Sequence, residues 1–269
     1  MSNPILSLKN LTIHFGGINA INNLSFDVQE GSISSLIGPN GAGKTTCFNC
    51  ISGFYKPDSG TITLKDKQIA GLPSYKIAEY GVARTYQNIR TYADLTVLEN
   101  ILAGQHDRLK SNLFDAMFHT KRFMDEDKLA LIEAGRIQEL MGLDGLGDTL
   151  ARNLPYGDQR RLEIARAIAS KPSLLLLDEP SAGMNPTETQ DLVRLIRKLR
   201  DEIGITVFII EHDMHVVMGI SDEIAVLDFG NKIAEGKPAE IQSNSRVIEA
   251  YLGPGGAALA KKYRRKKAS

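Results

Sequence analysis

The feature that most constrains the fold is a glycine-rich loop that follows an apolar segment and precedes a segment favouring a helix. The apolar segment, SISSLI, covers residues 32–37. The loop is Gly38-Pro39-Asn40-Gly41-Ala42-Gly43-Lys44-Thr45-Thr46, and it satisfies the phosphate-loop pattern G-x-x-x-x-G-K-S/T. This order of strand, loop and helix predicts a nucleotide-binding α/β fold.

Each type of side chain in this loop has a physical role. Glycines at 38, 41 and 43 let the backbone curl, so that successive N–H groups and the helix N-terminus surround a phosphate. Lys44 is placed to bridge the β- and γ-phosphates of a nucleotide, and Thr45 to offer its hydroxyl to Mg²⁺. The alternative is a glycine-rich turn that binds nothing, which the strand-loop-helix order disfavours.

A second apolar segment ends in a pair of acids. Residues 174–177 are all leucine, and Asp178, Glu179 and Pro180 follow. Acids at the carboxyl end of a parallel strand lie where such sheets bind ligands, so Asp178 is expected to hold Mg²⁺ through water. Glu179 points differently and is expected to polarise the attacking water as general base. Alone, this triplet is typical of a solvated turn; beside a phosphate loop it indicates a catalytic site.

The 269 residues predict one large domain, or a core with an inserted subdomain. Strands are expected at 5–8, 11–15, 24–28, 32–38 and 61–64, with turn-like residues at 16–23 and 29–32. From 75 to 150 the pattern is mainly helical, which indicates an inserted helical subdomain. After residue 170, continuous apolar strands alternate with helices, as in parallel βαβ units buried on both faces.

Charge is separated along the chain although its total is zero. The 32 basic residues balance 32 acidic ones, but six basic residues lie within 261–267, so the rest of the chain is mildly acidic. Such a body argues against nucleic acid as a partner. The basic tail has two interpretations: attraction to an anionic membrane surface, or a solvated disordered end, which we favour.

Cys47 and Cys50 form a C-x-x-C spacing in the segment after the phosphate loop. This spacing occurs in redox pairs and in halves of metal sites. The sequence has no second cysteine pair, and free cysteines are usually small buried residues. We therefore expect packing rather than redox chemistry.

Residues 153–167, NLPYGDQRRLEIARA, complete a set of motifs. Together with the phosphate loop and the acid pair, this run resembles the signature of ATP-binding cassette (ABC) ATPases. The family pattern is L-S-G-G-Q before an arginine-rich helix; Leu154 and Gly157 match it, whereas Pro155, Tyr156 and Asp158 replace Ser, Gly and Gln. The resemblance implies that this signature, which is Leu154, Pro155, Tyr156, Gly157, Asp158 and Gln159, caps the γ-phosphate held by another subunit.

The departures change what this signature offers a phosphate. Pro155 has neither hydroxyl nor N–H, but proline suits a first helical position, so the helix and its positive end should persist. Phosphate contact would then rest on the Gly157 amide and the helix terminus. The Asp158 side chain would have to point away from the phosphate, because two negative charges repel each other.

Further positions match the family. The resemblance implies that Phe15 stacks on adenine, although a buried core phenylalanine is an equal alternative. It implies that Gln87 touches Mg²⁺ and the water and links the site to the helical subdomain, and that His212 reaches the γ-phosphate. The implied dimer-contact loop is Ser181, Ala182, Gly183, Met184 and Asn185, with Asn185 where the family usually has Asp.

The resemblance therefore implies a P-loop NTPase fold of the ABC ATPase type. Its parts are a mixed, mostly parallel core sheet, an N-terminal antiparallel β subdomain and an inserted helical subdomain. The implied single domain covers 5–252, with the core at about 5–90 and 165–252 and the helical subdomain at about 91–164. Residues 253–269 would be a flexible link and the basic tail.

A finer resemblance is to the ATPase subunits of bacterial high-affinity branched-chain amino-acid importers. It rests on runs such as GPNGAGKTTCFNCISGFYKP, NLPYGDQRRLEIAR and IEHDM, and on the tyrosine in the signature above all. It implies ATP hydrolysis with Mg²⁺ and pairing with a second, different or identical ATPase subunit. Two membrane permeases and, indirectly, a periplasmic solute-binding protein are the other implied partners.

No apolar run approaches the roughly 18 residues that cross a bilayer, so we expect a soluble, cytoplasmic protein. The resemblance implies that permease subunits hold it at the cytoplasmic face of the inner membrane. The alternatives are the ATPase of a lipid or lipopolysaccharide exporter, of a urea or amide importer, or a non-transport ABC protein. Residues 109–118, LKSNLFDAMF, have apolar residues at helical spacing. They are expected either to help receive a permease helix or to pack within the helical subdomain.

Overall fold

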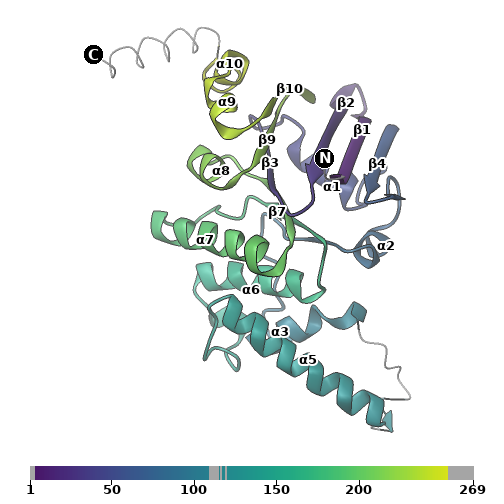
Figure 1. Cartoon of the computed structure of the whole chain (residues 1–269), viewed down its shortest axis with the longest axis vertical. Helices are drawn as coiled ribbons and strands as arrows, with labels where there is room; N and C mark the ends of the chain where they lie inside the picture. The colour runs from purple at the N-terminus through teal and green to yellow at the C-terminus, as the bar shows by residue number, and fades with distance from the viewer. Residues whose placement is uncertain (1–3, 109–114, 116, 119, 254–269) are drawn as a thin grey trace.

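The computed structural model describes residues 4–108, 115, 117–118 and 120–253 (Figure 1). The strands are β1 (Pro4–Phe15), β2 (Ile18–Gln29), β3 (Ile33–Ile37), β4 (Ser59–Leu64), β5 (Lys67–Gln68), β6 (Val82–Arg84), β7 (Leu174–Asp178), β8 (Thr206–Ile210), β9 (Glu223–Asp228) and β10 (Asn231–Gly236). The helices are α1 (Lys44–Ile51), α2 (Ser74–Glu79), α3 (Val97–Ala103), α5 (Lys121–Leu140), α6 (Tyr156–Ala169), α7 (Pro186–Ile203), α8 (Met214–Ile220), α9 (Pro238–Ser243) and α10 (Ser245–Leu252), with short 3₁₀ turns η1 (His106–Arg108) and η2 (Ala151–Asn153).

The strands form two sheets. One has the order β10-β9-β3-β8-β7-β6, and its strands are parallel except for β10, which runs antiparallel to β9. The other has the order β2-β1-β4-β5 and is antiparallel. Because β3, β8 and β7 are neighbours, the segments that leave their carboxyl ends emerge at one edge of the sheet. The predicted α/β class, with a mixed core sheet and an antiparallel N-terminal sheet, is confirmed.

The all-leucine strand β7 shows why the central strands are apolar throughout. Leu174 and Leu176 pack into the core shared with the antiparallel sheet, whereas Leu175 and Leu177 pack into the core under the helices. Successive side chains of a strand point to opposite faces, so a sheet covered on both faces needs apolar residues at every position.

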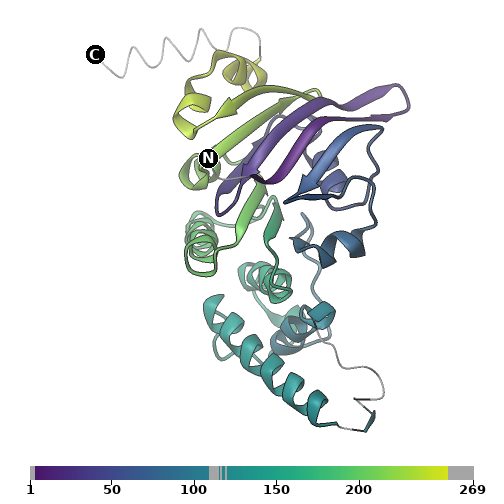
Figure 2. The same ribbon diagram turned by 45° about the vertical axis from the view of Figure 1, so that its right-hand side comes forward.

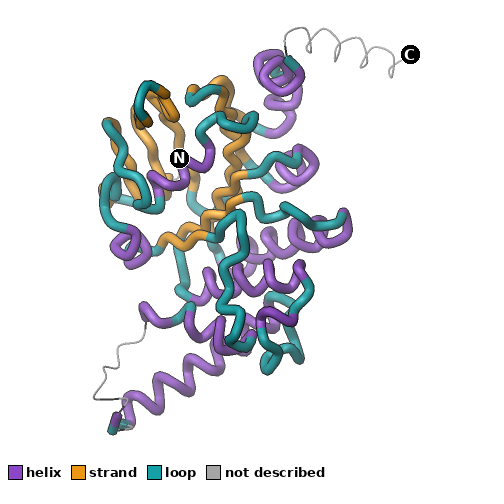
Figure 3. The backbone as a smooth tube through the Cα atoms, turned by 180° about the vertical axis from the view of Figure 1, so that it is seen from behind, coloured by secondary structure: helices purple, strands orange, loops and turns teal. Residues whose placement is uncertain are grey.

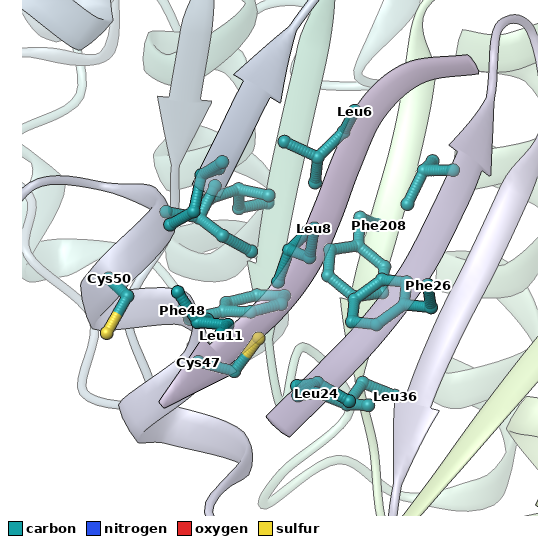
Figure 4. Packing of buried hydrophobic residues seen from close by; sticks show 14 of the residues in the cluster. Leu6, Leu8, Leu11, Leu24, Phe26, Leu36, Cys47, Phe48, Cys50 and Phe208 are labelled. Carbon is teal, nitrogen blue, oxygen red and sulfur yellow. The ribbon is translucent and has the colours of Figure 1, made fainter. Parts of the chain in front are cut away.

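The first of these cores fills the space between the two sheets and α1 (Figure 4). Phe208 of β8 lies at its centre, with its ring centroid 5.3 Å from that of Phe26 and 5.1 Å from that of Phe48. Cys47 and Cys50 contribute their side chains to the same cluster. The expectation that both cysteines are buried packing residues is confirmed.

Burial sets the reactivity of these thiols. It raises the pKa of Cys47 well above 9.0 and that of Cys50 to about 12. We expect native protein to react with a thiol reagent at pH 8 far more slowly than urea-unfolded protein, as mass spectrometry of alkylated protein would report. Equal labelling rates would contradict the burial.

Between pH 9 and 12 the unfolded state loses a Cys50 proton that the native state keeps, so the free energy of unfolding should fall as pH rises through that range.

The helices α3, α5 and α6 gather at the end of the molecule away from the antiparallel sheet (Figures 1 and 2). Seen from behind, the strands lie in the upper part of the molecule and these three helices in the lower part (Figure 3). Helix α6 joins the two parts, because Leu162 and Ile164 pack in one core with Leu175 of β7. Helix α5 turns Ala130, Ala134 and Ile137 inward. None of the helices in the described ranges is long and apolar enough to cross a membrane.

The N-terminal hairpin is longer than predicted. Residues 5–8 and 11–15 form one strand, and most of the expected turn at 16–23 belongs to β2. Asn10 and Asn23 have φ of 52°, and the register of β1 against β2 shifts between Leu8 and Leu11. A bulge tolerates such left-handed asparagines, so the polar residues stay within the strands.

Two further differences concern the C-terminal part and the segment 109–118. Helices α9 and α10 were not predicted, and α10 ends at Leu252. Most of 109–118 and all of 254–269 lie outside the described residues, so the structure does not test the expectations for them.

Candidate functional site

The phosphate loop leaves β3 at the centre of the parallel sheet. A Cβ on Gly38 would lie 2.1 Å from the Leu227 carbonyl oxygen, and one on Gly43 would lie 2.3 Å from that of Ala20. Both residues have positive φ, 151° and 103°. Glycine is therefore required at both positions for two reasons: the positive φ and the close approach of another segment's carbonyl group. This is expected for a loop whose amides face a ligand.

Lys44 begins α1 and lies over this loop. Its Nζ donates to the carbonyl oxygens of Gly38 at 2.7 Å and Pro39 at 3.0 Å. Burial lowers the pKa of Lys44, while the nearby carboxylates of Glu179 and Asp178 act in the opposite direction. The ammonium therefore lies within electrostatic range of both acids. Thr45, the next residue, is exposed.

Asp178 ends β7 and is 4% exposed. Arg84 Nη2 of β6 donates to Asp178 Oδ2 at 2.8 Å, while Nη1 donates to Asn49 of α1 and to Ser52 at its C-cap, each at 2.8 Å. Arg84 therefore joins the acid-bearing strand to the helix that follows the phosphate loop. Arg84 was not predicted from the sequence, although an arginine in a short strand beside buried acids indicates an internal ion pair.

Three residues predicted to be catalytic meet at one carboxylate. Gln87 Nε2 donates to Glu179 Oε2 at 3.0 Å, and His212 Nδ1 lies 3.6 Å from the same oxygen. Glu179 has φ of 46°. A left-handed, non-glycine residue directly after a strand is uncommon, and such conformations cluster at functional sites.

Glu211, directly before His212, is a second buried carboxylate at the site. It is fully buried, and its Oε1 accepts hydrogen bonds from the N–H and hydroxyl of Ser181 at 3.0 and 2.5 Å. Its Oε2 accepts from the N–H groups of His212 and Asp213 at 2.9 and 3.2 Å. Glu211 therefore ties the loop containing Ser181 to the segment that carries His212. Glu211 was not predicted from the sequence.

The signature run forms the start of α6, which begins at Tyr156 with Pro155 at the N-cap. The expectation that Pro155 occupies the first helical position is wrong by one residue. Its ψ of 154° is extended, as is usual for a cap. Gln159 Nε2 donates to the Leu154 carbonyl oxygen at 2.8 Å, which ties the start of the helix to the residue before its cap.

One turn further along α6 lies a buried ion pair, Arg160 with Glu163. Arg160 Nη1 donates to Glu163 Oε2 at 2.8 Å and to the Tyr86 carbonyl oxygen at 2.7 Å, and Nη2 donates to the Gln87 carbonyl oxygen at 2.9 Å. Glu163 Oε1 accepts from the N–H groups of Tyr86 and Arg90 at 3.3 and 3.2 Å. The pair therefore holds the backbone around Gln87. An arginine and a glutamate three apart in a helix, flanked by apolar residues, were the signal for it.

The remaining predicted residues lie at the edges of this region. Asn185 caps α7: its Oδ1 accepts from the N–H groups of Thr187 and Glu188 at 2.9 and 3.0 Å. Phe15 is 45% exposed at the end of β1, with its ring centroid 5.1 Å from that of Tyr55. Phe15 is therefore not a core residue, and its aromatic neighbour Tyr55 was not predicted from the sequence.

Comparison with known proteins gives matches over most of the chain. Residues 21–182 match the family model described as ABC transporter, and residues 231–253 match the model described as branched-chain amino acid ATP-binding cassette transporter. The high-affinity branched-chain amino acid transport ATP-binding protein LivG of Salmonella typhimurium is 50% identical over 94% of this chain and 99% of that protein. BraF of Pseudomonas aeruginosa, described in the same words, is 48% identical over the same shares.

A solved structure gives the same result for the fold. The ADP conformation of MJ1267, an ATP-binding cassette of an ABC transporter, is similar with a TM-score of 0.82 and 32% identity. The similarity covers 94% of this chain and 100% of that chain. Both kinds of comparison therefore extend over nearly the whole length described.

Proposed function

The chain belongs to the ABC transporter family of ATP-binding proteins, with LivG and BraF as close relatives, and we propose that it is the ATP-hydrolysing subunit that powers import of branched-chain amino acids through partner permeases. The resemblance inferred from the motifs is confirmed. The observation that carries the proposal is the convergence of Gln87 and His212 on Glu179, at the sheet edge where the phosphate loop emerges.

We propose that ATP binds with its phosphates against the amides of residues 38–46 and with its adenine against Phe15. The backbone approach required at Gly38 and Gly43 supports a phosphate cradle at this loop. Lys44 is already directed over the loop and would exchange its carbonyl contacts for phosphate oxygens. The exposed ring of Phe15 offers a stacking surface.

Mg²⁺ fits the donors at this site. The Thr45 hydroxyl, the Gln87 amide oxygen and the Asp178 carboxylate are all hard oxygen donors of the kind that Mg²⁺ accepts. We assign Thr45 and Gln87 as direct ligands and Asp178 as a ligand through water. When bound, the ion neutralises charge on the β- and γ-phosphates.

Glu179 is assigned as the general base. The hydrogen bond from Gln87 fixes the orientation of its carboxylate, so it can take a proton from a water attacking the γ-phosphate in line. His212 would contact the γ-phosphate, and the Asp178–Arg84 ion pair keeps the neighbouring acid in place. Positioning and charge neutralisation supply most of the rate in reactions of this class.

The partners follow from the same proposal. A second ATPase subunit, identical or different, would place its ATP against the signature residues 154–159 and the loop 181–185 of this chain. Two permeases, fed by a periplasmic solute-binding protein, would hold the chain at the cytoplasmic face of the membrane. The division of the chain into a core and a helical subdomain at about residues 91 and 164 belongs to this proposal as well.

A permease-binding surface is proposed on α5 and the residues just before it. Six large apolar side chains there are exposed: Met117, Phe118, Met124, Leu129, Leu131 and Ile132. We expect Met124→Ser with Leu131→Ser, seven residues apart on one face of the helix, to reduce co-purification of permeases by about tenfold or more, because fully burying each of these side chains contributes about 1.5–3 kcal/mol. Ile203→Ser, an exposed apolar position on α7, is the matched control. Full permease recovery with the α5 pair would remove this assignment.

The function itself is tested by identifying what co-purifies with the tagged full chain from native membranes. Mass spectrometry should find two permeases and a second ATP-binding subunit, with Mg²⁺-dependent ATP hydrolysis by the purified complex. Permeases of a lipid, lipopolysaccharide, urea or amide system would redirect the substrate assignment. Ribosomes or DNA in place of permeases would overturn the transport function.

A further inference from the structure

The tyrosine that departs from the family signature makes a contact within its own chain. The Tyr156 hydroxyl donates to the Ala182 carbonyl oxygen at 2.9 Å. The ring lies against the next residue, since a Cβ on Gly183 would be 3.3 Å from Tyr156 Cε1. The start of α6 is thus attached to the loop 181–185 by a hydrogen bond and by ring packing.

The same tyrosine lies next to the buried ion pair of α6. Arg160 Nη2 is 3.4 Å from the Tyr156 hydroxyl and 2.9 Å from the Gln87 carbonyl oxygen. Arg160 is fully buried, so its guanidinium has a fixed position. Tyr156 therefore stands between two segments: the backbone that carries Gln87, reached through Arg160, and the loop that contains Ala182.

Both segments are connected to the Glu179 carboxylate through hydrogen bonds and short contacts. Gln87 binds Glu179 directly at 3.0 Å. Ser181, next to Ala182, is held by Glu211, whose other oxygen accepts from the N–H of His212. A shift of the 181–185 loop would therefore displace the start of α6 and the residues around Glu179.

We propose that Tyr156 is a positioning residue that couples the signature to the dimer-contact loop within one chain, so that both are presented to the partner ATPase as one unit. The standard signature has Gly at this position, and glycine has no side chain to make such a link. The proposal rests on the proposed function for the role of the two segments. The link itself is a property of the isolated chain.

Hydrogen–deuterium exchange of the full chain tests the link directly. A neutral hydrogen bond changes a local equilibrium by about two- to tenfold, so Tyr156→Phe should speed amide exchange in residues 181–185 by that factor. Exchange in residues 38–46 should change less than twofold. Tyr75→Phe, an exposed tyrosine on α2, is the matched control and should leave residues 181–185 unchanged.

A kinetic measurement on the purified transporter complex gives a second readout. Tyr156→Phe should lower kcat by about two- to tenfold with little change in KM, because a positioning link acts after nucleotide has bound. Tyr156→Gly, the family residue, should behave in the same way in both measurements.

The outcomes separate the link from the function. Unchanged exchange in residues 181–185 with Tyr156→Phe would overturn the link. Faster exchange with Tyr156→Gly alone would assign the effect to ring packing on Gly183 and also overturn the hydroxyl's role. Faster exchange in the isolated chain, combined with no ATP hydrolysis by the wild-type complex, would support the link and count against the proposed function instead.

Discussion

Glu179→Gln should lower the steady-state rate of ATP hydrolysis by the transporter complex by about 100-fold or more, the scale expected when a general base is removed. Glutamine has nearly the same shape, but it cannot accept a proton from the attacking water. The phosphate loop and Lys44 are untouched, so the variant should still bind ATP. The bound nucleotide should then hold the ATPase dimer closed, and size-exclusion chromatography with ATP should show dimer without turnover.

The control for this variant is Glu202→Gln on the exposed end of α7, where the side chain is 59% exposed beside Lys198. It removes the same charge away from the site and should hydrolyse ATP at the wild-type rate. Undiminished hydrolysis by Glu179→Gln would show that another group accepts the proton. Loss of ATP binding together with hydrolysis would instead indicate a disrupted site.

Arg160→Met should lower the free energy of unfolding by about 3–5 kcal/mol, because it leaves the Glu163 carboxylate buried without its cation. Arg160 is fully buried and Glu163 is 2% exposed, so water does not replace the lost guanidinium. The backbone carbonyls of Tyr86 and Gln87 lose donors as well. Urea unfolding followed by circular dichroism measures the change.

The neighbouring residue provides a matched control. Arg161 lies 3.8 Å from Asp191 with its side chain 28% exposed, and ion pairs with solvent access contribute about 1 kcal/mol or less. Arg161→Met should therefore lower the free energy of unfolding by about 1 kcal/mol or less. Adding Glu163→Gln to Arg160→Met should recover part of the loss, since it removes the unpaired charge. Equal effects of the two single arginine variants would contradict the role assigned to this buried pair.

Much of the fold could be predicted because local patterns and global packing agree. The run of leucines in β7 requires burial on both faces, and Gly38 and Gly43 of the phosphate loop lie where the backbone approaches other chain segments closely. The long hairpin was missed because Asn10 and Asn23 look like turn residues in isolation. Only the partner strand shows that they form bulges.

The residues of the candidate site also fall into two groups: those that sequence motifs predict and those that appear only in the structure. Residues with a fixed spacing around a motif, such as Lys44, Asp178 and Glu179, are found from sequence, because the strand and loop dictate where they lie. Arg84, Arg160 and Glu211 act through contacts between segments distant in sequence. A single sequence does not say which buried carboxylate an arginine meets, so these supporting residues appear only in the structure. Tyr156 was noted as a departure, but its contact with Ala182 was not foreseen.

We conclude that this chain couples ATP hydrolysis to import of branched-chain amino acids. The direct measurement is uptake of radiolabelled leucine by proteoliposomes that contain the purified transporter complex and the solute-binding protein, with ATP on the side of the ATPase subunits. We predict uptake that requires both ATP and Mg²⁺, competes with isoleucine and valine, and disappears with Lys44→Ala. ATP hydrolysis without uptake of leucine, isoleucine or valine would contradict the claim.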